Sequence, residues 1–171
     1  CSMGEYEEAL DSYEKSLSLR RKVLGEEHPY TADSYNNIGT IYDDLGEHEK
    51  ALEYYQKALD IRKIVLGEDH PYTADSYNNI GAIYNDIDEN QKALEFHLKA
   101  LSIRKQALGE DHPDIAFSYN NLGNTYKNMG DYPTALKYYK KSLAISKKVV
   151  GDEYINLAPS YYNIGTIFKN Q

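Results

Sequence analysis

The sequence contains the stretch Gly67-Glu-Asp-His-Pro-Tyr-Thr-Ala-Asp-Ser-Tyr-Asn-Asn-Ile-Gly-Ala-Ile-Tyr84. It is almost unchanged at 25–42 and looser at 109–126, and a worn copy without the His-Pro pair lies at 151–168. Each copy begins 42 residues after the one before it. A fixed period of this length is typical of stacked supersecondary units. The sequence therefore predicts one repeat array over residues 1–171, whose apolar surface is buried between neighbouring units.

The period also predicts the boundaries of the units. We expect a half unit at 1–34, full units at 35–76, 77–118 and 119–160, and a terminal half unit at 161–171. The units 35–76 and 77–118 are identical at 27 of 42 positions. Prolines 29, 71 and 113 suit the first position of a helix, and second helices are expected at about 47–66 and 89–108. With no plausible strand, we predict an all-α chain of about eight antiparallel helices.

A glycine recurs inside the first helix of each unit. Tyr77, Ile80, Gly81 and Tyr84 share one helical face, yet glycine at mid-helix costs about 1 kcal/mol relative to alanine. The recurrence of Gly81 as Gly39, Gly123 and Gly165 predicts a helix–helix contact too close for a β-carbon.

The last unit departs from the pattern. Residues 152–155 (Asp-Glu-Tyr-Ile) replace the Glu-Asp-His-Pro of 110–113, and Pro159 stands where Phe117 stood. Proline one turn inside a helix removes a donor and clashes with the preceding turn. We therefore expect the last helix to start near Ala158 or to be kinked.

Composition narrows the class of protein. Hydrophobic residues at 41% and charged residues at 27% are typical of a soluble folded chain. No apolar run approaches the roughly 18 residues of a membrane span, and the N-terminus lacks the pattern of a signal peptide. The single Cys1 cannot form an internal disulfide, which favours an intracellular, cytoplasmic protein. A net charge of −8 argues against non-specific nucleic-acid binding.

One set of residues carries a family resemblance, namely Tyr35, Asn37, Ile38, Gly39, Tyr42, Gly46, Ala51, Tyr55 and Ala58. Their spacing resembles the tetratricopeptide repeat signature, with eight residues more than the common 34-residue form and no closing proline. This variant is similar to the repeats of kinesin light chains. The resemblance implies a right-handed α-α superhelix whose first helices line a concave groove for peptides or proteins. It implies no enzymatic activity and no cofactor.

The first-helix face opposite the core is rich in asparagine. An asparagine offers an acceptor and two donors, so a row of them can hold the main chain of an extended peptide. The resemblance places this face in the groove, and we predict ligand contacts by at least some of its residues. The alternative is that asparagines such as Asn37, Asn79, Asn121 and Asn163 only satisfy polar groups of the scaffold. The predicted groove residues are Asp33, Asn36, Asn37, Thr40, Asp43, Asp44, Asp75, Asn78, Asn79, Asn85, Asp86, Asn120, Asn121, Asn124, Lys127, Asn128, Tyr162 and Asn163.

The charge of the chain changes along its length. It is negative over 1–118 and positive over 119–160, so the groove is rich in aspartate first and carries lysine later. Such a surface would steer a partner with a basic segment. The binding of acidic cargo peptides, for which kinesin light chains are known, does not carry over. An acidic strip that serves only solubility is the alternative interpretation.

Other candidate sites are weaker. The clusters that end in His28, His70 and His112 superficially resemble metal ligands, but one histidine per unit gives no closed coordination shell. We interpret them as helix entries with acidic residues near the positive dipole end, and expect no metal. His97 replaces a tyrosine found in the other units; a core histidine is favoured over a pH switch. No side chains form a nucleophile–base pair, so we expect no enzyme.

Two functions fit these features. The first is a non-enzymatic protein–protein interaction scaffold that binds a protein segment in the groove, away from membranes and nucleic acid. The second is a structural protein that stacks head to tail, because a second helix at one end and a first helix at the other are complementary. Such heterologous contacts produce rings or filaments.

Overall fold

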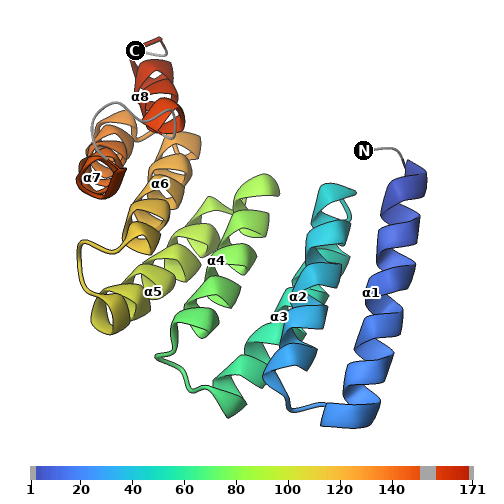
Figure 1. Cartoon of the computed structure of the whole chain (residues 1–171). Coiled ribbons are helices and arrows are strands. Elements are labelled where there is room, and N and C mark those ends of the chain that lie inside the picture. The colour runs from blue at the N-terminus through green and yellow to red at the C-terminus, as the bar shows by residue number, and fades with distance from the viewer. Residues whose placement is uncertain (1–2, 151–156, 170–171) are drawn as a thin grey trace.

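The computed structural model describes residues 3–150 and 157–169. Within these residues the chain forms eight helices and no strand, as predicted. Successive helices pack against each other in an open, curved array, with α1 at one end and α8 at the other (Figure 1). The helices are α1 (Met3–Leu24), α2 (Pro29–Asp44), α3 (His48–Val65), α4 (Pro71–Asp86), α5 (Asn90–Leu108), α6 (Pro113–Asn128), α7 (Tyr132–Val150) and α8 (Ala158–Lys169).

The His-Pro pair starts the first helix of a unit. Helices α2, α4 and α6 begin at the predicted prolines, and the preceding histidine is the N-cap in each. The His70 Nδ1 accepts a hydrogen bond from the Tyr72 backbone N–H at 3.1 Å, and His28 and His112 make the equivalent contact. A side-chain acceptor at this position satisfies one of the free N–H groups of the first turn. The interpretation of these clusters as helix entries is therefore confirmed.

The chain reverses at a glycine after α1, α3 and α5. Gly67 has a φ of +93°, and Gly25 and Gly109 have φ of +93° and +82°. Only glycine adopts this left-handed region without strain, and it ends the helix at that point.

The last helix begins where Pro159 requires. Helix α8 starts at Ala158, one of the two outcomes expected from the proline. This start leaves Pro159 near the beginning of the helix, where its missing N–H breaks no intrahelical hydrogen bond. The altered connector predicted at 152–155 lies outside the described residues.

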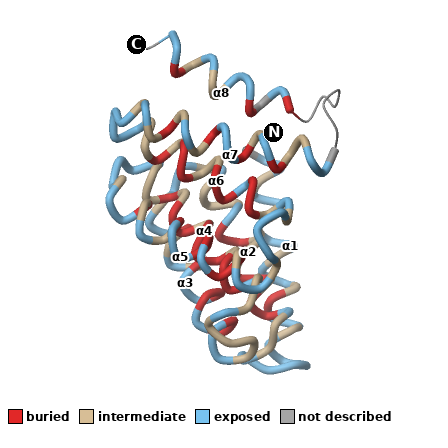
Figure 2. Tube along the Cα trace, turned by 90° about the vertical axis from the view of Figure 1, so that its left-hand side faces the viewer, coloured by how far each residue is buried: buried red, intermediate tan, exposed pale blue. Residues whose placement is uncertain are grey.

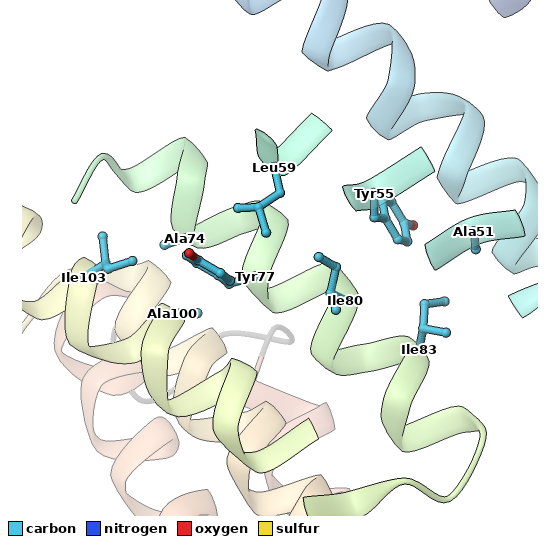
Figure 3. Packing of buried hydrophobic residues seen from close by; sticks show 9 residues of the cluster. All are labelled: Ala51, Tyr55, Leu59, Ala74, Tyr77, Ile80, Ile83, Ala100 and Ile103. Atoms are coloured by element: carbon cyan, nitrogen blue, oxygen red, sulfur yellow. The ribbon is translucent and has the colours of Figure 1, made fainter. Parts of the chain in front are cut away.

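The apolar core lies between helices and runs the length of the array. Its largest cluster joins three helices: Ala51, Tyr55 and Leu59 from α3, Ala74, Tyr77, Ile80 and Ile83 from α4, and Ala100 and Ile103 from α5 (Figure 3). Figure 2 shows the buried residues on the sides of the helices that face one another. An aromatic stack recurs in each unit, with ring centroids 5.4–5.5 Å apart, between Tyr42 and Tyr54, Tyr84 and Phe96, and Tyr126 and Tyr138.

The mid-helix glycine accepts a ring from the second helix of the same unit. A β-carbon added to Gly39 would lie 2.8 Å from Cδ1 of Tyr55, and one added to Gly81 would lie 2.8 Å from Cε1 of His97. At Gly123 the distance to Cδ1 of Tyr139 would be 2.5 Å. These distances are too short for any side chain, so the predicted close contact is confirmed at all three.

The same prediction is wrong for Gly165. No atom lies within 4 Å of a β-carbon added there. The physical reason is that the close neighbour of such a glycine is a ring on the following helix, and no described helix follows α8.

None of the helices among the described residues combines the length and the apolar character needed to cross a membrane.

The two kinds of glycine make a matched pair of variants. Gly123→Ala should lower the free energy of unfolding by about 1–3 kcal/mol, because the new methyl group collides with the Tyr139 ring. Gly165→Ala should raise it by about 0.5–1 kcal/mol, because alanine is the better helix former and the space is open. Urea unfolding followed by circular dichroism measures both. Equal effects of the two substitutions would contradict the close-contact explanation.

Candidate functional site

The predicted groove residues lie on α2, α4, α6 and α8. In Figure 1, α4, α6 and α8 lie toward the inside of the arc, while α5 and α7 lie outside. Each predicted residue belongs to one of these four helices, and most are partly or fully exposed. The structure thus brings side chains that are far apart in sequence onto one side of the array.

A ladder of asparagine pairs links successive first helices. Asn79 Nδ2 donates to Asn36 Oδ1 at 2.9 Å, Asn121 Nδ2 to Asn78 Oδ1 at 2.6 Å, and Asn163 Nδ2 to Asn120 Oδ1 at 2.9 Å. Asn78 is only 4% exposed. These amides satisfy one another across the scaffold, which is the role weighed as the alternative for them.

Arginine side chains from the second helices form a second set of links. Arg62 Nη2 donates to Asp33 Oδ1 at 2.8 Å, while its Nη1 donates to Ser76 Oγ at 2.8 Å and to the Tyr72 carbonyl at 3.1 Å. Arg62 on α3 therefore joins α2 to α4. Arg104 on α5 makes the equivalent contacts with Asp75, Ser118 and the Asp114 carbonyl, joining α4 to α6. Arg20 reaches Ser34 and the Tyr30 carbonyl. We call this arrangement the arginine clasp.

The clasp was not predicted from the sequence, where Asp33 and Asp75 were predicted as groove residues, with solubility of the acidic strip as the alternative. Arg62 and Arg104 are 7% and 4% exposed, and a buried arginine requires charge partners. The signal was present, because arginine recurs at 20, 62 and 104 with the repeat period. An arginine that recurs at one position of an otherwise largely apolar helix face could have predicted the clasp.

A polar hollow of about 420 Å³ opens between α4, α5, α6 and α8. We call it the His97 hollow. Seven of the nine residues that line it were predicted as groove residues. Its lining is Ala82, Asn85, Asp86, His97, Asn121, Asn124, Lys127, Asn128 and Asn163.

The hollow exists because two positions depart from the repeat together. In the preceding unit the Tyr55 hydroxyl lies 3.2 Å from Thr40 Oγ1, and in the following unit the Tyr139 hydroxyl donates to Asn124 Oδ1 at 2.7 Å. At the equivalent positions stand His97, which has no phenol group, and Ala82, which has no polar side chain. Both replacements shorten the side chains that would otherwise meet there.

A polar network specific to this unit borders the hollow. The Thr125 hydroxyl donates to the Asn121 carbonyl at 3.0 Å, so it can only accept from Asn85 Nδ2, at 2.9 Å. Asn85 Nδ2 also lies 3.4 Å from His97 Nε2. This orientation leaves Asn85 Oδ1 and His97 Nδ1 buried without hydrogen-bond partners. His97 is 1% exposed; this burial, and secondarily the charge of Arg104, lowers its pKa to about 4.

Acidic side chains occupy the ends of α2 and α4 that already carry negative dipole charge. Asp43 and Asp44 are the last residues of α2, and Asp86 is the last residue of α4. Carboxylates at a helix C-terminus are unfavourable. Burial, and then repulsion from Asp86, raises the pKa of Asp43, and burial raises that of Asp86. Lys127 occupies the corresponding end of α6. The groove is therefore negative beside α2 and α4 and turns positive at α6.

The remaining predicted residues are spread along the face. Asn36, Asn37 and Thr40 lie on α2, with the Thr40 hydroxyl also donating to the Asn36 carbonyl at 3.1 Å. Tyr162 on α8 is 72% exposed. Among the described residues, no group of three or more His, Cys, Asp or Glu side chains is placed to hold a metal ion.

The sequence matches one protein-family model along its whole length. A family model described as Tetratricopeptide repeat matches residues 1–64, 44–106, 73–148 and 114–171. The chain belongs to the tetratricopeptide repeat family. The right-handed α-α superhelix expected from the resemblance is confirmed, since the structural neighbours are solenoids of this type. No curated protein matches the sequence.

Several solved structures share the fold. BtubC (BKLC) from P. vanneervenii superposes with a TM-score of 0.84 at 26% identity, over 97% of this chain and 66% of that one. A putative kinesin light chain with nearly identical TPR-like repeats from Podosopora anserina gives 0.77 at 22% identity, over 97% and 79%. The apo form of RapI gives 0.78 at 22%, over 98% of this chain. The chain spans just under two thirds of BtubC and 45% of RapI.

The buried His97 predicts a pH-dependent stability. Its pKa is about 4 in the folded protein and about 6.5 when unfolded. Between these values the unfolded chain binds a proton that the folded chain excludes, so stability falls as the pH drops from 6.5 toward 4. The loss from this group is on the order of 3 kcal/mol.

The double variant Ala82→Thr, His97→Tyr is the control. It removes the histidine but keeps the neighbouring charged residues Asp86, Lys127 and Arg104, so any pH dependence that arises from them remains. Urea midpoints at about pH 7 and about pH 4.5 should differ more for the native chain than for the variant. An equal shift in both would contradict a neutral, desolvated His97.

Proposed function

We infer that the chain, as a tetratricopeptide repeat array, is a protein-interaction scaffold. We propose that it binds an extended segment of a partner protein along the face of α2, α4, α6 and α8. The observation that carries this proposal is the His97 hollow, which gathers seven predicted groove residues beside unfavourable carboxylates. The proposal includes no catalysis, and the repeat fold is typical of non-enzymatic proteins. An intracellular location remains a prediction from composition.

We further propose that the partner segment carries basic residues. The carboxylates of Asp43, Asp44 and Asp86 lie at the negative ends of their helices, and Asp43 and Asp86 repel each other. A lysine or arginine from a partner would relieve this repulsion, and complementary charge also increases the rate of association. The rigid ladder and clasp behind these side chains reduce the entropy lost on binding.

The groove side chains are not equally suited to a test. Substitution of Asn78 or Asn121 removes a rung of the ladder, and substitution of Asp75 removes a clasp partner, so these changes alter the scaffold itself. Asp44 and Asp86 are exposed and make no hydrogen bond within the described residues. Substitutions at these two positions therefore test binding to the groove without removing a contact of the scaffold.

A displayed library of random peptides provides the test. The native chain should select peptides with lysine or arginine, and the variant Asp44→Lys, Asp86→Lys should bind them at least about tenfold more weakly, measured by fluorescence anisotropy. Glu49→Lys, Glu95→Lys makes the same change of charge on exposed positions of the second helices and should leave the affinity unchanged.

Three outcomes contradict the proposal. The library yields no peptide, the selected peptides carry no basic residue, or the control variant weakens binding as much as the groove variant.

Self-assembly is a second candidate, favoured by the open space at Gly165. Gly39, Gly81 and Gly123 each receive a ring from the next helix, whereas Gly165 has no neighbour within 4 Å. Tyr13 on α1 occupies the repeat position of those rings, 42 residues before Tyr55. We propose that α1 of a second copy packs on α8 with its Tyr13 against Gly165. Repetition of this head-to-tail contact extends the superhelix.

Sedimentation velocity over a concentration series tests this contact. The 171-residue chain should associate as its concentration rises, and Gly165→Leu should abolish association because the side chain occupies the space for Tyr13. Gly165→Ala, with its smaller group, should weaken association less. A strict monomer at high concentration, or association that Gly165→Leu leaves intact, contradicts the contact.

A further inference from the structure

The clasp is absent where α7 meets α6 and α8. Arginine stands at 20, 62 and 104, but the next residue in this series is Ser146. Its acidic partner changes at the same junction, because Phe117 replaces the aspartate found at 33 and 75. Ser160 retains the serine that Ser76 and Ser118 offer to the other arginines. Both charges of the ion pair have therefore been lost together, while the serine partner is retained.

The loss leaves a second hollow, of about 360 Å³. We call it the Phe117 hollow. It lies where α6, α7 and α8 meet, in the space that an arginine side chain from α7 would cross. Its lining is Pro113, Ala116, Phe117, Asn120, Ser142, Ser146 and Ser160.

The lining of this hollow differs in chemistry from that of the His97 hollow. Among the described residues that line it, none is charged, and the Phe117 side chain is 54% exposed. Burial of exposed apolar surface contributes about 25 cal/mol per Å². The nearby guanidinium carbon of Arg104 lies 5.7 Å from the Phe117 ring centroid, but that cation is already bound to Asp75 and Ser118. The hollow therefore favours an apolar side chain over a charged one.

One asparagine pair of the ladder contributes a lining residue to each hollow. Asn120 lines the Phe117 hollow, Asn163 lines the His97 hollow, and Asn163 Nδ2 donates to Asn120 Oδ1 at 2.9 Å. A single extended segment that crosses this rung can place one side chain in each hollow. Asp86 at the end of α4 lines the His97 hollow, and Asp43 and Asp44 stand at the corresponding end of α2.

We propose that the Phe117 hollow is the anchor subsite for a bulky apolar side chain of the partner segment. The basic residues of that segment then lie toward Asp86 and the end of α2. This proposal rests on the proposed function, since it specifies the segment bound in the same groove. It assigns to the partner a motif of one apolar anchor with basic residues on one side of it.

The double variant Phe117→Asp, Ser146→Arg tests the subsite. It restores the residues of the clasp, keeps the net charge, and closes the hollow with the arrangement seen at Arg62 and Asp33. The variant should unfold at the same urea concentration as the native chain or a higher one. The variant Glu49→Lys, Glu95→Lys is the control, because its substitutions lie on exposed positions of the second helices outside both hollows.

The readout is a double-mutant cycle with a peptide selected by the native chain. Replacement of the peptide's apolar anchor by alanine should weaken binding to the native chain and to the Glu49→Lys, Glu95→Lys control by about tenfold or more. The same replacement should have almost no effect on the double variant, whose hollow is filled. Replacement of the peptide's basic residue should weaken binding to all three proteins alike.

The outcomes separate the two proposals. If the native chain selects no peptide, the proposed groove function fails. If it selects basic peptides without a recurring apolar residue, or if the anchor contributes equally to the double variant, the Phe117 subsite is overturned while groove binding stands.

Discussion

The close contact between a glycine and a ring sets the spacing on which the rest of the array depends. At Gly39, Gly81 and Gly123 the missing β-carbon lets the ring of Tyr55, His97 or Tyr139 lie directly on the first helix. A glycine at mid-helix is unfavourable by about 1 kcal/mol, and packing of a large ring offsets that cost. Each helix pair is thereby fixed at one separation, so every unit presents the same surface for stacking.

Polar links then join one unit to the next. The asparagine ladder runs between first helices, and Arg62 and Arg104 join α2 to α4 and α4 to α6 from behind. A buried arginine needs partners for its charge, and serine, carbonyl and aspartate oxygens bind the terminal nitrogens of Arg62 and Arg104, although Arg104 Nε is buried without a hydrogen-bond partner. The predicted groove face is therefore held in place by hydrogen bonds within the scaffold, which limits the movement of its remaining side chains.

The features that distinguish this array from a uniform one are paired departures from the repeat. His97 with Ala82 removes a hydroxyl contact and opens a polar hollow, while Ser146 with Phe117 removes an ion pair and opens an uncharged one. In each case both partners of an interaction have changed, so no charge is left unpaired in the core. When the rest of a chain follows its repeat pattern and its local structural preferences, departures of this kind are expected at functional sites.

The helices, their order and the close contacts at Gly39, Gly81 and Gly123 could be predicted from the sequence alone. The 42-residue period, Pro71 at a helix start and Gly81 inside a helix report on local geometry, which the backbone of each unit imposes wherever it stands. Which predicted groove residues support the scaffold is visible only in the packed helices. The contacts concerned join residues far apart in the sequence: Asn79 and Asn36 are 43 residues apart, and Arg62 and Asp33 are 29 apart. The tertiary structure likewise decided that Gly165 is open and that Phe117 borders a hollow. These properties depend on which helix packs next to each residue. The 42-residue period predicts the order of the helices but not which side chains fill the space between two units.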